Sequence, residues 1–394
     1  MKLFIKIIAS TFQHATRDKK EMAVAAELGW QVVVVAKGPK NHFEKVEGWD
    51  VHFRTTRPLG ELGRLNGINR WITVWKWARY VRKLKGDVIS CHDILALTIG
   101  WVSTWFLPIS VKPLLIYDSH EFELGRNTSG KRGLFKKKIL TILEKFLIGK
   151  SAITMMVNDS IAQDVKEIYG LKEKPLVVRN IPPYWHINDK ISQKRRKEFC
   201  RALKVPDSSF ILMYHGAITT NRGIEQLIGA TREIPDCVII LLGFGSDQYL
   251  FLLKKYISEC EMEGRILFLD AVPLTVLWEY LGASDAGIML DQNTCKSYYY
   301  SLPNKLFENI QSEKMVIGSN FPEYRQIIEG YNIGLCCDPH NPVEITNTIR
   351  RIKNDKQLRD HFKSNLKTAK TTLCWENEKI ILQTAYSGLL SKTE

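Results

Sequence analysis

The sequence predicts an α/β protein built from two doubly wound parallel sheets. Short, strongly apolar runs alternate with segments long enough for a helix, and this alternation occurs in two successive series. Alternating strands and helices are typical of a parallel sheet covered by helices on both faces. The chain has 394 residues and is 45% hydrophobic, which favours two domains, each with a core of its own.

The first series of predicted strands occupies the amino-terminal half. Its apolar runs are 3–9, 31–36, 87–90, 113–119, 152–157 and 175–180. The first run passes directly into the polar stretch TFQHATRDKKE, so we interpret it as a buried strand and not as a signal peptide. The longest apolar segment, 94–110, contains Pro108 and precedes a strand, which favours a core helix over a membrane span.

The second series repeats this rhythm. Its predicted strands are 210–216, 237–245, 265–270, 286–290, 314–319 and 332–337. Between the two series, NIPPYWHINDKISQKRRKEFC joins a proline pair to a charged helix and is interpreted as a hinge. We therefore predict one domain over 1–182, a second over 183–370 and a terminal segment over 371–394. Ligands of such sheets bind at the carboxyl ends of the strands, so two facing domains are expected to enclose a cleft.

Charge is distributed unevenly between the two halves. Residues 1–180 contain 30 Lys and Arg against 17 Asp and Glu, whereas residues 181–394 contain 26 against 25. This asymmetry indicates that the first half meets an anionic surface. The eight cysteines are irregularly spaced and form no C-x-x-C, which indicates neither a disulfide framework nor a metal site and favours a cytoplasmic location.

The segment LPNKLFENI predicts a helix start that suits a phosphate. Pro303 is typical of the first turn of a helix, because its missing N–H has no partner there anyway. The free amides of such a turn attract anions, and Lys305 adds a positive charge.

Two further helix starts in the second half have the same character. The loop in YHGAITTNRGIEQLIGA places Gly216 and Arg222 between a strand and a helix, and LLGFGSDQYL places Gly243 and Gly245 after the next strand. A lone Gly-x-Gly is more often an ordinary tight turn. Three phosphate-competent helix starts in one domain together predict a nucleoside-diphosphate site.

These segments carry a family resemblance. The block LPNKLFENIQSEKMVIGSNFPEYRQIIEGYNIGLCCDP, with GAITTNRGIEQLIGA and LLGFGSDQ before it, resembles the donor domain of retaining GT-B glycosyltransferases of family 4. The segments TRDKKEMAVAAELGWQVVVVA, ISCHDILAL, LIYDSHEFE and VVRNIPP are similar to the acceptor domain of that family. CWENEKIILQTAYSGLL is similar to the terminal helix that crosses back to the first domain. The resemblance implies two facing Rossmann-like domains and retaining transfer of a sugar from a nucleotide-diphosphate donor to an acceptor hydroxyl.

The resemblance also implies a set of donor-binding residues. Glu308 matches the second of two family glutamates and is expected to hold the ribose hydroxyls, whereas Tyr300 stands in place of the first. Arg222 matches the second member of a basic pair, Ala217 replaces the first member, and Lys305 is expected to supply the missing charge. The full predicted donor set is Gly216, Arg222, Gly243, Gly245, Tyr300, Pro303, Asn304, Lys305, Leu306 and Glu308. Arg222 and Glu308 are also predicted to be catalytic.

His120, in YDSHE, is the third predicted catalytic residue. It follows a strand of the first domain, and in the family a matching histidine contacts the donor sugar and phosphate. A histidine at a strand end is also often only structural. Asp118 and Glu121 are interpreted as a loop cap and an orienting partner.

Four other residues of the first half are predicted to bind the acceptor. His92 and Asp93 follow a strand in SCHD, although Asp93 is as well explained as a helix N-cap. His14 and Arg17 are expected to open the first helix on the same rim, with a solvated helix start as the alternative.

No metal and no cofactor are predicted. The chain lacks a D-x-D suited to a metal-bound diphosphate, so helix amides and cations are expected to stabilise the departing charge. Front-face attack is the expected route to retention, and a covalent intermediate on an unidentified carboxylate stays open. A nucleic-acid partner is not expected, because the basic residues fall in no recognised motif. The alternatives are a sugar-nucleotide epimerase of similar fold and an inactive nucleotide-sugar-binding protein, which Tyr300 and Ala217 would explain.

Two amphipathic segments predict peripheral attachment to the inner face of the cell membrane. Segment 131–150 places an apolar stripe beside five cations, and segment 69–86 interleaves tryptophans with cations. The stripe residues are Leu134, Phe135, Ile139, Ile142, Leu143, Phe146 and Leu147, and the tryptophans are Trp71, Trp75 and Trp77. Packing of both stripes on the sheet is the alternative. Membrane attachment would bring the acceptor site to a lipid-linked saccharide used in surface polysaccharide biosynthesis.

Overall fold

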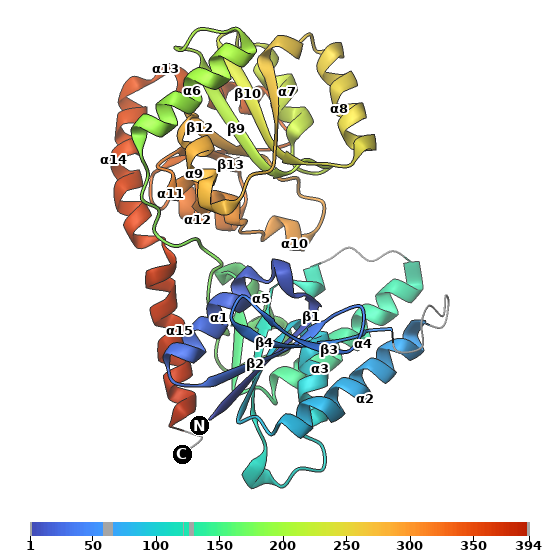
Figure 1. The fold of residues 1–394 in the computed structure, drawn as a ribbon. Helices are drawn as coiled ribbons and strands as arrows, with labels where there is room; N and C mark the ends of the chain where they lie inside the picture. Colours follow the sequence, from blue (N-terminus) through green and yellow to red (C-terminus); the bar gives the residue numbers. More distant parts are fainter. Residues whose placement is uncertain (1, 58–65, 121, 126–129, 392–394) are drawn as a thin grey trace. The chain divides into compact units, whose positions relative to one another are not determined.

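The computed structural model describes residues 2–57, 66–120, 122–125 and 130–391. The chain forms two compact units (Figure 1). Unit 1 consists of Met1–Asn180 and Glu378–Glu394, and unit 2 of Ile181–Asn377. The sequence predicts a first boundary after residue 182, and the structure divides the chain after residue 180. The second boundary is predicted after residue 370 and lies after residue 377.

Unit 1 is built on an eight-stranded sheet with the strand order β3-β4-β2-β1-β5-β6-β7-β8. The strands are β1 (Leu3–Thr11), β2 (Gln31–Lys37), β3 (His42–Val46), β4 (Trp49–Arg54), β5 (Val88–His92), β6 (Leu114–Ser119), β7 (Ile153–Met156) and β8 (Leu176–Val177). The six predicted strands of this half are confirmed. The sheet reverses its direction of growth between β1 and β5, which are parallel neighbours. Ligands of doubly wound sheets bind at such a switch point.

The hairpin β3–β4 was not predicted. It is antiparallel and turns at Glu47 and Gly48, which both have positive φ. Two consecutive residues of this conformation form the tight turn that matches the twist of paired strands. The middle of β3 is exposed to solvent, so the strand has no apolar run that would reveal it.

The helices of unit 1 follow the strands. They are α1 (Thr16–Glu27), α2 (Asn66–Leu84), α3 (Asp93–Ser103), α4 (Gly130–Ile148) and α5 (Asp159–Tyr169), and a 3-10 turn, η1 (Phe12–His14), precedes α1. Within the apolar segment 94–110, the residues up to Ser103 form the predicted core helix α3, and α2 packs against it, whereas Phe106 and Ile109 of the following loop are exposed. Among the described residues, no helix is both long and apolar enough to cross a membrane.

Unit 2 has a wholly parallel six-stranded sheet with the order β11-β10-β9-β12-β13-β14. The strands are β9 (Phe210–Ala217), β10 (Cys237–Phe244), β11 (Ile266–Asp270), β12 (Ala286–Met289), β13 (Met315–Ser319) and β14 (Gly334–Cys337). All six agree with the prediction. The inner strands β9, β10, β12 and β13 are mostly buried, as expected for a sheet covered on both faces, whereas the edge strands β11 and β14 are less buried. The switch point of this sheet lies between β9 and β12.

The helices of unit 2 complete the βα pattern. They are α6 (Asp189–Leu203), α7 (Ile224–Arg232), α8 (Asp247–Glu259), α9 (Leu274–Gly282), α10 (Lys296–Tyr299), α11 (Asn304–Gln311), α12 (Pro322–Ile328), α13 (Pro342–Asn354) and α14 (Lys356–Thr372). Ser246 caps α8 through its side chain, which accepts a hydrogen bond from the amide of Tyr249. Both units are therefore Rossmann-like, and the expected fold class is confirmed.

The last helix, α15 (Trp375–Leu390), belongs to unit 1 from Glu378 onward. Glu378 pairs with Arg179 at 3.0 Å, and Lys379 pairs with Glu27 of α1 at 2.6 Å. Deeper in the unit, Tyr386 is buried against Phe4 of β1. The terminal helix is thus an integral part of the amino-terminal unit.

Candidate active site

The predicted donor residues of unit 2 gather at the carboxyl edge of its sheet. Gly216, the second-last residue of β9, has φ near 106°, a conformation that favours glycine. A Cβ atom at this position would lie 2.7 Å from Cε of Lys305. The glycine therefore lets the lysine of α11 lie directly over the end of β9. The loop and the helix start predicted from separate motifs are brought together here.

Gly243 and Gly245 have a packing reason of their own. A Cβ atom on Gly243 would lie 1.8 Å from the carbonyl oxygen of Gly216, and one on Gly245 would lie 2.5 Å from that of Ile218. Neighbouring backbone fills the space that side chains would need. The close approach of β9 and β10 accounts for both glycines.

Arg222 lies on the loop between β9 and α7 and is held by Asp291. Its Nη1 is 2.9 Å from Oδ1 of Asp291, whose other oxygen accepts a hydrogen bond from Tyr324. Burial alone would lower the pKa of Arg222, but the carboxylate of Asp291 raises it above its usual value. Asp291 is buried just after β12, so it fixes the cation at the switch point.

Lys305 is the second cation of this edge. Its ammonium group donates to the hydroxyl of Tyr214 at 2.9 Å, and that hydroxyl donates to the carbonyl of Ala217. Burial lowers the pKa of Lys305 to about 8, since the charged form loses solvation. The negative charge of Asp291 raises the pKa of Lys305, whereas the positive charge of Arg222 lowers it further. Two cations that disfavour each other in one place are typical of a site for an anion.

Glu308 projects from α11 toward β9. Its Oε2 lies 2.7 Å from Nε2 of His215, the residue before Gly216. Both side chains are largely buried. Glu308 therefore lies one helical turn from Lys305, at the same strand end, where a carboxylate suits a vicinal diol.

The other predicted donor residues border this edge. Pro303 is the N-cap of α11, and the exposed Asn304 is its first residue. The prediction of Leu306 as a donor-binding residue was wrong. Its side chain is buried in the core and its amide donates to the carbonyl of Pro303, so neither is available to a ligand. Tyr300 follows α10 and lies 5.5 Å, ring to ring, from Tyr299.

In unit 1, His120 follows β6 and is oriented by Asp118. Its Nε2 lies 2.6 Å from Oδ2 of Asp118, and its amide donates to Asp93. Asp118 is fully buried inside β6, so it is the orienting partner and not a loop cap. Glu121, expected in the orienting role, lies outside the described residues.

The alternative interpretation of Arg17, as a solvent-exposed residue at a helix start, is wrong. Arg17 is buried, and its guanidinium binds both oxygens of Asp118 and the carbonyl of Val178. The Asp118 carboxylate raises the pKa of Arg17, against the effect of burial. Arg17 therefore supports Asp118 and, through it, His120. His14 belongs to η1, and its side chain lies outside what the structure describes.

A buried charge network continues beneath these residues. Lys6 of β1 lies 2.9 Å from Asp18 and 2.7 Å from Glu21, both of α1. Tyr386 of α15 donates to Glu21 at 3.1 Å. Burial raises the pKa of Glu21 to about 8, and the nearby Asp118 adds to the effect. The terminal helix is thereby hydrogen-bonded into the network that carries His120.

His92 and Asp93 lie at the end of β5, beside His120. The rings of His92 and His120 are 3.7 Å apart, and His92 Nδ1 is 2.8 Å from Asp18. Burial lowers the pKa of His92, but hydrogen bonds to Asp18 and Asp93 outweigh it and raise the pKa to about 10. His92 is the N-cap residue of α3, so the N-cap role considered for Asp93 is wrong.

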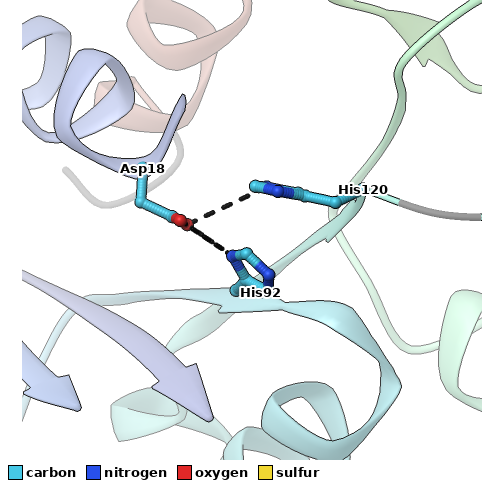
Figure 2. A group of neighbouring side chains, drawn as sticks. All are labelled: Asp18, His92 and His120. Carbon is cyan, nitrogen blue, oxygen red and sulfur yellow. Dashed lines mark hydrogen bonds and ion pairs between the residues drawn. The ribbon is translucent and has the colours of Figure 1, made fainter. Parts of the chain in front are cut away.

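Asp18, His92 and His120 form a group of residue types that can bind a metal, which their spacing in the sequence does not reveal (Figure 2). Their potential ligand atoms lie within 4.8 Å of one another. Figure 2 shows the Asp18 carboxylate directed between the two imidazoles. However, Lys6 already pairs with Asp18, and a protonated His92 has no free lone pair on either ring nitrogen with which to bind a metal. We therefore interpret the group as a charge-compensated hydrogen-bond network.

Several residues of both sites were missed by the sequence analysis. They are Tyr214, His215 and Asp291 in unit 2, and Lys6, Asp18 and Glu21 in unit 1. One signal was available: Lys6 interrupts the apolar run LFIKIIA, and a charge inside a buried strand requires buried partners. No comparable signal marks Asp291.

Two protein-family models match the chain, one in each unit. The model of glycosyl transferases group 1 matches residues 195–369, and that of glycosyltransferase family 4 matches residues 23–180. An uncharacterized glycosyltransferase of Methanocaldococcus jannaschii is 24% identical over 297 residues, which cover 72% of this chain and 70% of the relative.

Solved structures share the fold. Sucrose-phosphate synthase from Thermosynechococcus elongatus aligns with a TM-score of 0.75 and 17% identity, over 99% of this chain and 100% of that one. HepE from Anabaena, in complex with UDP and glucose, aligns with a TM-score of 0.72 and 16% identity over the same shares. With two Rossmann-like units and a family match in each, the chain belongs to the GT-B glycosyltransferases of family 4.

Proposed function

We propose that the protein transfers a sugar from a nucleotide-diphosphate donor to an acceptor hydroxyl with retention at the anomeric carbon. The observation that carries the proposal is the convergence of Arg222, Lys305 and Glu308 at the end of β9. Two cations suit a diphosphate, and a helix-borne carboxylate suits the ribose hydroxyls. The chain's similarity to HepE, which was solved with UDP, makes a uridine nucleotide the first donor to test.

The proposed chemistry is front-face substitution. The bond between the anomeric carbon and the leaving phosphate oxygen breaks, and the acceptor oxygen bonds to the same face of the sugar. The acceptor proton passes to the leaving phosphate oxygen, so no base on the protein is needed. Arg222 and Lys305 stabilise the negative charge that develops on the diphosphate. We assign to His120 a contact with the donor sugar, held in place by Asp118.

Metal-independent catalysis is part of the proposal. Stabilisation of the leaving group is assigned to fixed cations, because Arg222 is locked by Asp291 and Lys305 by Tyr214. Such preorganised charges need no reorganisation during the reaction.

A thermal-shift panel of UDP-, GDP- and ADP-sugars tests the donor site. A ligand at a hundred times its Kd stabilises the folded state by about 2.7 kcal/mol, so selective binding identifies the base and the sugar. Transfer is then measured with Glu308→Ala and Arg222→Ala, with excess chelator present. Each variant is expected to lose about 2 to 4 kcal/mol of transition-state stabilisation, roughly a hundredfold or more in rate.

Arg325→Ala is the control for these variants, because Arg325 pairs with Glu329 on the surface of the same unit. Its activity should remain at the wild-type level. Wild-type turnover of the Glu308 or Arg222 variant would contradict the site assignment. Activity that needs added magnesium or manganese would contradict metal independence.

An inactive nucleotide-sugar-binding protein is the second candidate. Tyr300 and Ala217 favour it, since both replace residues of the family's donor pattern. Slow hydrolysis of the bound donor in the absence of acceptor would decide against it.

We also assign to unit 1 a cytoplasmic, peripheral attachment to the membrane and a lipid-linked acceptor of surface polysaccharide biosynthesis. Much of the predicted apolar stripe is exposed to solvent: Trp71 is 74% and Phe135 65% exposed. The prediction was wrong for Trp77 and Leu147, because their side chains are buried in the core and cannot contact a bilayer. The exposed apolar residues of α2, α4 and the loop after α3 are Ile68, Trp71, Trp75, Trp105, Phe106, Ile109, Val111, Leu134, Phe135, Ile139, Ile142 and Phe146.

We call these exposed apolar residues the apolar band, and ring contacts connect the three elements that carry it. Trp75 of α2 meets Trp105, Trp105 meets Trp101 of α3, and Trp101 meets Phe146 of α4. Exposed cations accompany the band on both helices, among them Lys76 and Lys136. Aromatic side chains flanked by cations suit the interface of an anionic bilayer.

A further inference from the structure

Unit 1 contains a cavity at the amino ends of β5 and β6. Its volume is about 800 Å³, within the range of small-molecule sites. It is enclosed by the end of α2, the turn before β5, the end of α3 and the loop from α3 to β6. Four segments of the chain thus form one concave surface.

The cavity is separate from the candidate active site. Asp87 lines it and directly precedes β5, whereas His92 ends the same strand. Five residues of extended chain span about 16 Å. In the same way, Leu114 lines the cavity and begins β6, whereas His120 follows the end of that strand. A ligand of this cavity lies at the opposite edge of the sheet from His120, so it is not the reacting saccharide.

Positive charge dominates the polar part of the lining. Arg82, Lys85 and Lys112 are the cations, and Asp87 is the carboxylate. Asp87 accepts a hydrogen bond from the amide of Leu3 at 2.6 Å, so one of its oxygens is already held by β1. Lys85 and Lys112 are exposed and form no ion pair among the described residues. Two ammonium groups are therefore available to an anion.

Arg82 holds the wall of the cavity in place. Its Nε and Nη2 donate to the carbonyls of Ser103 and Val102, at 2.9 and 3.1 Å. The same guanidinium lies 5.7 Å from the ring centre of Phe106, in the loop after α3. These contacts join the end of α2 to the end of α3 and to the loop beyond it. The cavity is therefore built before any ligand arrives.

The interior of the cavity is apolar, and the apolar band lines it too. Val81 and Ile89 are buried side chains of the lining. Ile109 and Val111, which belong to the band, also line the cavity and are 88% and 60% exposed. Apolar side chains beside unpaired lysines suit an amphiphile with an anionic head better than a small free anion.

We propose that this cavity binds one molecule of an anionic phospholipid, with Lys85 and Lys112 on the phosphate and an acyl chain against Val81 and Ile89. The inference rests on the proposed peripheral attachment and goes beyond it. A basic surface attracts any anionic bilayer without a defined stoichiometry. A lined cavity adds a saturable site for a single lipid, distinct from both the donor and the acceptor sites.

Calorimetry with dihexanoylphosphatidylglycerol, below its critical micelle concentration, tests the proposal. Wild-type protein should bind one molecule of this lipid, and it should bind dihexanoylphosphatidylcholine, which has no net charge, more weakly. The double variant Lys85→Asn/Lys112→Gln should weaken phosphatidylglycerol binding about tenfold or more, as expected for loss of charge-assisted contacts. Asparagine is chosen because Lys85 has a φ of 55°, which asparagine tolerates.

The double variant Lys76→Gln/Lys83→Gln is the matched control. It removes the same number of charges from exposed positions of α2 that do not line the cavity. Its affinity for dihexanoylphosphatidylglycerol should equal that of wild type. Matching melting curves would show that both double variants are folded.

Three results would overturn the proposal. They are absence of binding by wild-type protein, an equal loss of affinity in both double variants, and inorganic phosphate binding as tightly as the lipid. Vesicle flotation tests the attachment separately. Saturable lipid binding without flotation would contradict membrane attachment and support the cavity assignment. A UDP thermal shift tests glycosyl transfer independently, because the predicted donor residues all belong to unit 2.

Discussion

At the scale of single residues, the donor edge depends on side chains whose charge is held away from water. Lys305 is the clearest case, because its ammonium group is buried against Tyr214 and close to Arg222. A cation in this position is costly in the free protein and becomes favourable once an anion arrives. Its pKa of about 8 places this change within an accessible pH range.

Donor affinity should therefore fall as pH rises through about 8. Deprotonation of Lys305 above this pKa removes a positive charge from the diphosphate site, so UDP binding should weaken by about tenfold. Calorimetry of UDP binding between pH 6.5 and 9.5 measures this. Lys305→Met should bind UDP weakly throughout and lack the decline. Parallel pH profiles of the two proteins would show that another group titrates.

His120 should affect transfer more than donor binding. It belongs to unit 1, whereas the predicted diphosphate and ribose contacts belong to unit 2. His120→Ala is expected to slow transfer by a hundredfold or more while the UDP dissociation constant changes less than about threefold. Loss of UDP binding in this variant would contradict the division of roles. His361→Ala, a change at an exposed histidine of α14, is the control.

At the scale of elements, the charge network joins β1, α1, β6 and α15 beneath His120. Burial and the nearby Asp118 raise the pKa of Glu21, a carboxyl group of this network, from 4.5 to about 8. The folded state therefore holds this proton over a range in which the unfolded state has released it. Stability contributed at this position is present at low pH and is lost as pH rises from about 4.5 toward 8.

Glu21→Gln tests this element-level prediction, because glutamine mimics the protonated carboxyl group. The melting temperature of the variant relative to wild type should increase as pH rises from 5 to 8 and then level off. Melting curves at half-unit pH intervals provide the measurement. A difference that stays constant across this range would mean that Glu21 is ionised in the folded protein.

At the scale of the whole molecule, charge and exposed apolar surface occur in the same unit. The basic half of the sequence carries the apolar band, while the rest of the chain is nearly neutral. Clustered cations attract anionic lipid by about 1 kcal/mol each near the surface. An anionic bilayer is the partner that we propose for this surplus charge.

Vesicle flotation tests this attachment. Wild-type protein should float with anionic vesicles at low salt, less at high salt, and little with neutral vesicles. The double variant Lys136→Gln/Lys138→Gln removes two exposed cations of α4 and should weaken binding by about 2 kcal/mol, roughly thirtyfold. Phe251→Ser, at an exposed apolar residue of unit 2, should change nothing. Equal recovery in the soluble fraction under all conditions would favour a soluble acceptor.

Local patterns predicted most of the fold. The twelve apolar runs became twelve parallel strands, because a strand buried on both faces must be apolar along its whole length. The hairpin β3–β4 was not predicted by this rule, because the exposed edge strand β3 contains no apolar run. Arg222 and Lys305 were predicted from helix-start motifs, because each lies just before a helix or on its first turn, and Glu308 was predicted from the family resemblance.

The sequence by itself determined the two-unit α/β architecture and the basic character of the first half, and it predicted the main candidate donor residues. All of these depend on short stretches of chain. Only the tertiary structure decided which residues hold these in place. Asp291 reaches Arg222, and Tyr386 reaches Glu21, across long separations in sequence. The physical reason is that burial and pairing of charges depend on which strand ends become neighbours, and no local pattern encodes that.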